Sequence, residues 1–146
     1  MELLDYSSLN IWKERRSWIN NELENADLGS SSVSDHSVTL FMDMQIAFCS
    51  GAWISFVIMS ISVIDSHLRE TEASDNKIGT AKLLNEYYTG EDISCLRQLR
   101  NQYVHHNLER PIFNMNYWFN NQYEMEENAR KAMRMTISVF WQSWGT

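Results

Sequence analysis

A long stretch without any charged side chain, residues 44–64, is the feature that most restricts how this chain folds. The stretch is long enough for a membrane-spanning helix. Serines lie within it, and its flanking residues are Asp43 and Asp65 rather than Lys or Arg, which argues against a membrane span. A helix that is apolar nearly all round is also typical of the centre of a helical bundle. We therefore predict a central bundle helix and expect no membrane association, and we keep a membrane-associated helical protein as an alternative.

The composition indicates a compact, mostly helical and acidic protein. A length of 146 residues suits a single domain, and one Pro and five Gly supply little turn chemistry for a many-stranded β-sandwich or barrel. The 44% of hydrophobic residues argues against disorder as the main state. The formal net charge of -7 argues against a broad basic surface for nucleic acid.

Cysteine usage and the N-terminal sequence indicate the compartment. Cys49 and Cys95 are isolated, so they form neither a disulfide framework nor a zinc site. Residues 1–5 carry acids where a signal peptide needs basic residues. We expect a cytoplasmic protein with free thiols, no metal and no other cofactor.

Apolar periodicity predicts an all-α protein, an up-and-down bundle of four or five helices in one domain over residues 1–146. The predicted helices cover residues 8–25, 37–72, 78–89, 91–107 and 124–144. The aromatic and Asn-rich residues 111–123 lack periodicity and are predicted to form a long loop or broken turn. We divide the domain into residues 1–35, an N-terminal helix with a serine-rich connection, and residues 36–146, the bundle core.

One helical segment, Leu96–Asn107, contains residues suited to catalysis. Arg100 is followed by Asn101, and His105 comes five residues after the arginine. At about 100° per residue, Arg100 and His105 lie about 140° apart on a helix, so the three share one broad polar arc, and a tight site needs a second chain. The other histidines, His36 and His67, stand alone and are interpreted as surface or capping residues.

The chemistry of this set suits RNA cleavage without a metal. A histidine with an ordinary pKa of about 6.5 exchanges protons near neutral pH. A guanidinium binds a phosphate and stabilises the charge that develops on it. The alternative interpretation is that Arg100 is a surface cation. In that interpretation His105 and His106 only stabilise the helix, because they lie near its C-terminus, the negative end of the helix dipole.

The segment Leu96–His105 resembles the signature of the HEPN superfamily, whose nucleases carry Arg, a polar residue, three variable residues and His. The order of the predicted helices over residues 37–144 is similar as well. The resemblance implies a HEPN-like bundle that forms a homodimer with two motif copies in one cleft. It also implies a metal-independent endoribonuclease that acts as a prokaryotic toxin or abortive-infection effector.

The resemblance implies a role for each motif residue. His105 corresponds to the general acid or base, Arg100 to the group that binds the phosphate, and Asn101 to a support of the site geometry. We add three supporting candidates from the same helix: His106, Tyr103 and Arg97. The expected partners are an RNA substrate, a second copy of the chain, and a cognate antitoxin or regulatory protein. One toxin branch, paired with a nucleotidyltransferase antitoxin, carries Tyr where this chain has Asn107.

The alternative function is a HEPN-like helical module without catalysis that binds a partner or acts like an antitoxin. The intact set of motif residues favours the ribonuclease. The acidic net charge favours the alternative, unless Arg97 and Arg100 concentrate positive charge in a local cleft. The segment 114–121 either packs its aromatic rings onto the bundle or stacks unpaired bases.

Overall fold

The computed structural model describes residues 8–26, 35–73, 75, 77–90, 93–105 and 113–142, and these contain α-helices and no β-strand. The helices are α1 (Leu9–Ala26), α2 (Asp35–Ser50), α3 (Trp53–Thr71), α4 (Thr80–Tyr87), α5 (Ile93–Val104), α6 (Met115–Asn120) and α7 (Gln122–Gln142). The predicted all-α class is confirmed. The described part of the chain has more helices than the predicted four or five, for two local reasons.

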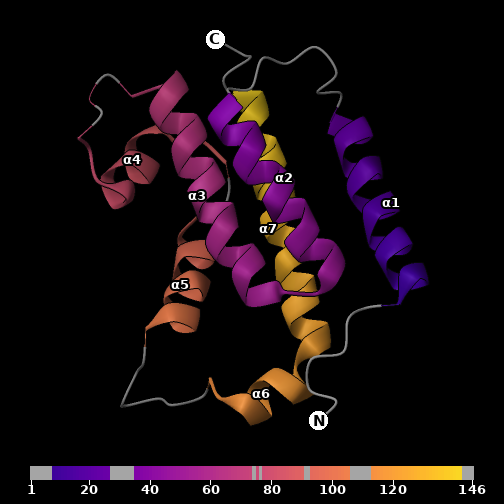
Figure 1. Cartoon of the computed structure of the whole chain (residues 1–146). Coiled ribbons are helices and arrows are strands. Elements are labelled where there is room, and N and C mark those ends of the chain that lie inside the picture. The colour runs from indigo at the N-terminus through magenta and orange to yellow at the C-terminus, as the bar shows by residue number, and fades with distance from the viewer. Residues whose placement is uncertain are drawn as a thin grey trace.

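The uncharged stretch forms a helical hairpin rather than one long helix. The chain reverses between α2 and α3, which run side by side (Figure 1). Gly51 adopts a φ of 79°, a left-handed conformation that glycine accepts without steric cost. The amides of Gly51 and Ala52 donate to carbonyls in the last turn of α2, at 3.1 and 2.9 Å. The predicted continuous helix over 37–72 is therefore wrong, and no helix within the described residues is long and apolar enough to cross a membrane.

The second difference lies in the predicted loop over 111–123. Asn114 caps α6, because its side-chain oxygen accepts a hydrogen bond from the Tyr117 amide at 2.9 Å. After Asn121, α7 begins at Gln122. The loop prediction is wrong for this part, since a helix as short as α6 is too brief to show periodicity. Trp118 packs against the core, whereas Phe119 is exposed.

The core is centred on α3, which contacts α2, α4, α5 and α7 (Figure 1). Phe48 of α2 sits among aromatic rings, with centroid distances of 5.3 Å to both Trp53 and Phe56. Burying a side chain of this size contributes roughly 1.5–3 kcal/mol. Ile19 of α1 is buried in the same core, so the first helix is part of the packed structure.

Polar contacts fix α1 against the hairpin and α7. Arg15 donates to the carbonyl of Cys49 at 3.2 Å, forms an ion pair with Glu126 at 3.1 Å, and lies 4.8 Å from the centroid of Trp53. Trp18 stacks on Phe48 at 5.1 Å, and two arginines of α7 lie over its ring. These contacts hold the turn between α2 and α3 from outside.

Candidate functional site

The predicted catalytic segment forms α5, whose two sides have different roles. Leu96 is buried against the core on one side. Residues three and four positions apart share a helix face, so Arg97, Arg100 and Asn101 lie together on another side. The packing of α5 on α3 therefore directs these polar side chains away from the core.

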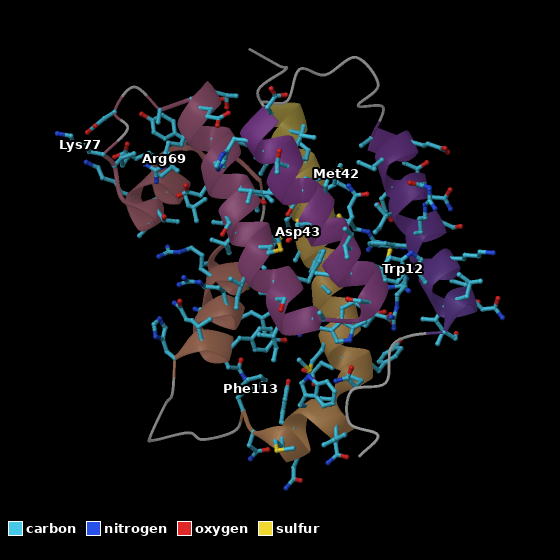
Figure 2. The ribbon with its side chains drawn as sticks, viewed as in Figure 1. Trp12, Met42, Asp43, Arg69, Lys77 and Phe113 are labelled. Carbon is cyan, nitrogen blue, oxygen red and sulfur yellow. The ribbon has the colours of Figure 1, made fainter. Side chains whose placement is uncertain are left out.

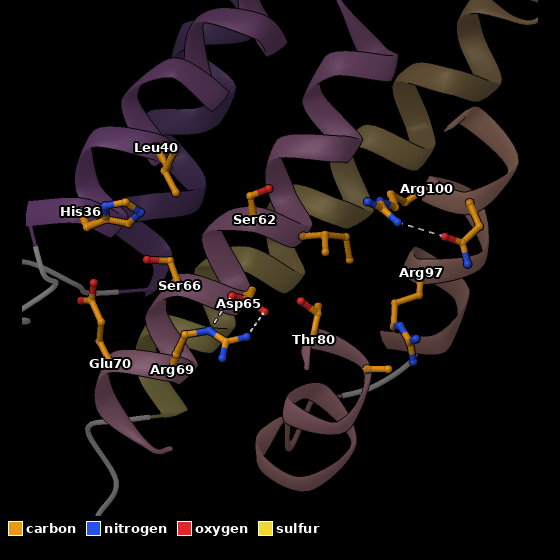
Figure 3. Close-up of a pocket in the computed structure, with 13 residues that line it drawn as sticks. His36, Leu40, Ser62, Asp65, Ser66, Arg69, Glu70, Thr80, Arg97 and Arg100 are labelled. Carbon is orange, nitrogen blue, oxygen red and sulfur yellow. Dashed lines mark hydrogen bonds and ion pairs between the residues drawn. The ribbon is translucent and has the colours of Figure 1, made fainter. Parts of the chain in front are cut away.

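These side chains line a cleft of about 570 Å³ between α2, α3, α4 and α5. Arg97 and Arg100 project into it from α5, opposite Asp65 and Arg69 of α3, and Thr80 of α4 lies between the two helices (Figure 3). The structure thus brings together three of the predicted site residues, Arg97, Arg100 and Asn101, in one concave site.

Among the described residues, one arginine of the cleft is paired with a carboxylate and two are not. Arg69 pairs with both carboxylate oxygens of Asp65, at 3.1 and 2.9 Å, and donates to the carbonyl of Ile78 at 2.6 Å. The hydrogen bond with Asp65 is the main cause that raises the pKa of Arg69. Arg97 and Arg100 are partly buried, and neither has a carboxylate partner within the residues that the structure describes.

The hydrogen bond that Arg100 makes orients its guanidinium group without neutralising the positive charge. Its Nη1 donates to Oδ1 of the neighbouring Asn101 at 3.2 Å (Figure 3). An amide oxygen carries no net charge, so the guanidinium keeps its full positive charge toward the cleft. A charged guanidinium group that has no carboxylate partner can bind phosphate or carboxylate oxygens through paired N–H donors.

His105 lies beyond the C-terminal end of α5 and is not among the residues that line the cleft. Its amide donates to the carbonyl of Asn101 at 2.9 Å, so the backbone continues the last turn, and its side chain is exposed. The predicted helix over 91–107 therefore ends earlier, at Val104. His106 lies outside the described residues.

Tyr103 does not line the cleft. It is 8% exposed and packs against Phe113, with ring centroids 5.1 Å apart, toward α6 and α7. Burial, followed by the nearby Tyr117 and Glu124, raises the pKa of Tyr103 to about 12, and the neighbouring Asn128 opposes this rise. Tyr103 is therefore a protonated packing residue that positions α5, rather than a group for proton transfer.

Of the two histidines interpreted as surface or capping residues, His36 is exposed near the start of α2, as expected, and His67 is not. His36 lines the cleft from α2, across from the arginines of α5 (Figure 3). No local pattern links it to α5, because the two helices are far apart in the sequence. His67 is 1% exposed and lies 5.1 Å from the ring of Phe140, so the surface interpretation is wrong. Burial lowers the pKa of His67, and Glu70 partly opposes this shift.

Within the described residues, no group of three or more His, Cys, Asp or Glu side chains is arranged to hold a metal ion. Cys49 is buried and Cys95 is exposed, and no disulfide joins them. No protein-family model, curated protein or solved structure matches this chain.

Proposed function

We propose that this protein is a metal-independent endoribonuclease of HEPN type that uses Arg100, Asn101 and His105. The observation that carries the proposal is the pair of partly buried arginines, Arg97 and Arg100, that face one cleft without a carboxylate partner among the described residues. Partly buried charges without counterions favour the binding of an anion such as a phosphodiester. The net charge of -7 restricts RNA binding to this local surface.

In the proposed reaction, Arg100 binds the scissile phosphate and Asn101 holds the guanidinium in place. The 2′-oxygen attacks phosphorus while the His105 imidazole accepts the 2′-hydroxyl proton. The bond between phosphorus and the 5′-oxygen breaks, and the leaving oxygen takes a proton from a second acid. The products are a 2′,3′-cyclic phosphate and a 5′-hydroxyl, so the reaction needs no metal and no added cofactor.

A homodimer is part of the proposal, because His105 lies outside the cleft of its own chain and the reaction needs a second proton-transfer group. The His105 of a second copy would supply the second proton-transfer group. The α2 helix offers a surface for such contact: Val38, Met42 and Ile46 recur every four residues and are 41%, 56% and 53% exposed. Met42 and the adjacent Asp43 are both exposed on α2 (labelled in Figure 2). An exposed apolar stripe of this kind favours a protein interface.

In this proposal the protein acts in the cytoplasm as a prokaryotic toxin or abortive-infection effector, under the control of a cognate antitoxin or regulatory protein. The same apolar stripe also favours the second candidate function, a HEPN-like module without catalysis that binds a partner protein or acts like an antitoxin. Sedimentation of the purified chain separates the two. If the protein is the proposed ribonuclease, the wild type should be a dimer, and Met42→Glu should dissociate it and abolish RNA cleavage. A wild-type protein that is strictly monomeric would contradict a site built from two copies.

The catalytic proposal is tested with structured and single-stranded RNA in EDTA. We expect Arg100→Ala and His105→Ala each to lower the cleavage rate by about 100-fold or more. Arg16→Ala, which removes an exposed arginine of α1, and Gln102→Ala, which removes an exposed polar side chain of α5, serve as matched controls with wild-type rates. Equal activity in all variants would refute the site assignment.

A further inference from the structure

The cleft has two chemically different ends. Arg97 and Arg100 mark one end, His36 and Glu70 mark the other, and the Asp65–Arg69 ion pair lies between them (Figure 3). The ion pair is internally neutralised, so it adds little net charge to the middle of the cleft. The rest of the lining is partly apolar, from Leu40, Ile61 and Ala81, and partly polar, from Ser62, Ser66, Thr80 and Asn101.

The dimensions suit a ligand that reaches both ends. The volume of about 570 Å³ lies within the range of small-molecule sites. The lining includes α3 residues from Ile61 to Glu70. At 1.5 Å per residue this part of α3 is about 13 Å long, which accommodates a nucleotide in an extended form.

Each end selects a different chemical group. The arginine end suits a phosphate, because its two guanidinium groups have no carboxylate partner within the described residues. At the other end, Glu70 presents a carboxylate acceptor that makes no ion pair in the described part of the chain, and His36 presents an imidazole N–H donor. Guanine carries adjacent N1–H and N2–H donors beside the O6 acceptor on one edge. This pattern complements a carboxylate and an N–H donor that line the same end of a cleft, whereas adenine presents a single amino group there.

We propose that the cleft binds one guanosine nucleotide of an RNA chain, with its phosphate on Arg97 and Arg100 and its base at His36 and Glu70. The claim that the nucleotide belongs to a cleaved RNA rests on the proposed ribonuclease function, but nucleotide binding does not require cleavage. Because Arg100 belongs both to this cleft and to the motif, a bound guanosine brings the phosphate on its 3′ side to the catalytic face of α5. Cleavage is then expected after guanosine.

Calorimetric titration of the full chain with 3′-GMP, 3′-AMP, 3′-CMP and inorganic phosphate tests the base-binding end. We expect 3′-GMP to bind about tenfold or more tightly than the other three ligands. Glu70→Gln and His36→Ala should reduce 3′-GMP affinity to that of 3′-AMP, while Glu24→Gln, an exposed carboxylate of α1, leaves it unchanged. Arg97→Ala should weaken all four ligands. Equal affinity for 3′-GMP and inorganic phosphate would overturn the proposal.

A parallel cleavage assay keeps the two proposals separable. Selective binding of 3′-GMP without any RNA cleavage would reject the ribonuclease and retain the nucleotide site. Cleavage that depends on Arg100 and His105 but shows no guanosine preference, with 3′-GMP bound no more tightly than 3′-AMP, would reject the guanosine site and retain the ribonuclease. His105→Ala, which lies outside the cleft, should abolish cleavage while 3′-GMP affinity stays at the wild-type value.

Discussion

Replacing Gly51 by Ala tests whether the uncharged stretch folds as a helical hairpin, because the sign of the stability change depends on it. In a continuous helix the substitution would stabilise the protein by about 1 kcal/mol, since Ala is the better helix former. In the hairpin, Gly51 has a φ of 79°, which an L-residue adopts at a cost of roughly 1–2 kcal/mol. The two structures therefore predict opposite effects on the free energy of unfolding.

A second contribution comes from Arg15. A Cβ added at Gly51 would lie 3.1 Å from Nη1 of Arg15, closer than an ordinary van der Waals contact. The guanidinium cannot move freely, because it is hydrogen-bonded to the carbonyl of Cys49 and to Glu126. We expect a total loss of roughly 2–3 kcal/mol for Gly51→Ala. For a chain of this length that loss lowers the Tm by about 4–12 °C.

Urea unfolding followed by tryptophan fluorescence and far-ultraviolet circular dichroism measures this loss. Gly79→Ala is the matched control, because Gly79 has a φ of -70° that Ala also adopts and nothing lies within 4 Å of its added Cβ. Gly79 caps the start of α4, so its replacement should change the stability by no more than about 1 kcal/mol. In an Arg15→Met background, Gly51→Ala should cost only the backbone contribution of about 1–2 kcal/mol. A Gly51→Ala protein as stable as the wild type, or more stable, would refute the hairpin.

Three further predictions follow from burial. Burial lowers the pKa of His67, so below pH 6.5 the unfolded chain binds a proton that the folded chain excludes, and the free energy of unfolding should fall as pH falls. His67→Gln should reduce this slope, and a slope equal to that of the wild type would contradict the assignment. In the native protein the exposed Cys95 should react with a thiol reagent at once, whereas Cys49, whose pKa is raised by burial, should react only on unfolding. Equal reaction rates of the two thiols would contradict the burial of Cys49. Trp18→Ala should cost about 2–3 kcal/mol, because Trp18 packs α1 against α2 and α7, and an unchanged melting curve would reject that role.

Local patterns predicted α1 well because the signals for its start lie next to it. Ser8 accepts a hydrogen bond from the amide of Ile11 at 3.2 Å, as expected for a helix cap. The reversal at Gly51 could not be predicted in this way. Apolar residues continue on both sides of it, so a hairpin and a single helix have the same local pattern. The contact with Arg15 that supports the turn comes from a distant part of the sequence.

The short helix α6 had a usable signal that periodicity alone does not capture. Asn114 precedes the helix and caps it through the amide of Tyr117. A search for capping residues, rather than for apolar repeats, would have placed a helix start within the predicted loop.

The candidate site was partly predictable. The spacing of Arg97, Arg100 and Asn101 is enough to place them on one helix face. The opposite wall of the cleft, with His36 and Glu70, depends on how α2 and α3 pack beside α5, which no local pattern specifies. The same packing leaves His105 outside the cleft. The angular spacing of residues around one helix was therefore not enough to predict which residues form the site.

The end groups of the RNA products test the central claim most directly. Purified protein is incubated in EDTA with an RNA of defined sequence, and the termini at each cut are identified by mass spectrometry. Attack by the 2′-hydroxyl at a phosphate held by Arg100 predicts a 2′,3′-cyclic phosphate on one fragment and a 5′-hydroxyl on the other, with neither formed by Arg100→Ala. Fragments that end in a 3′-hydroxyl and a 5′-phosphate, or RNA left intact by the wild-type protein, would contradict it.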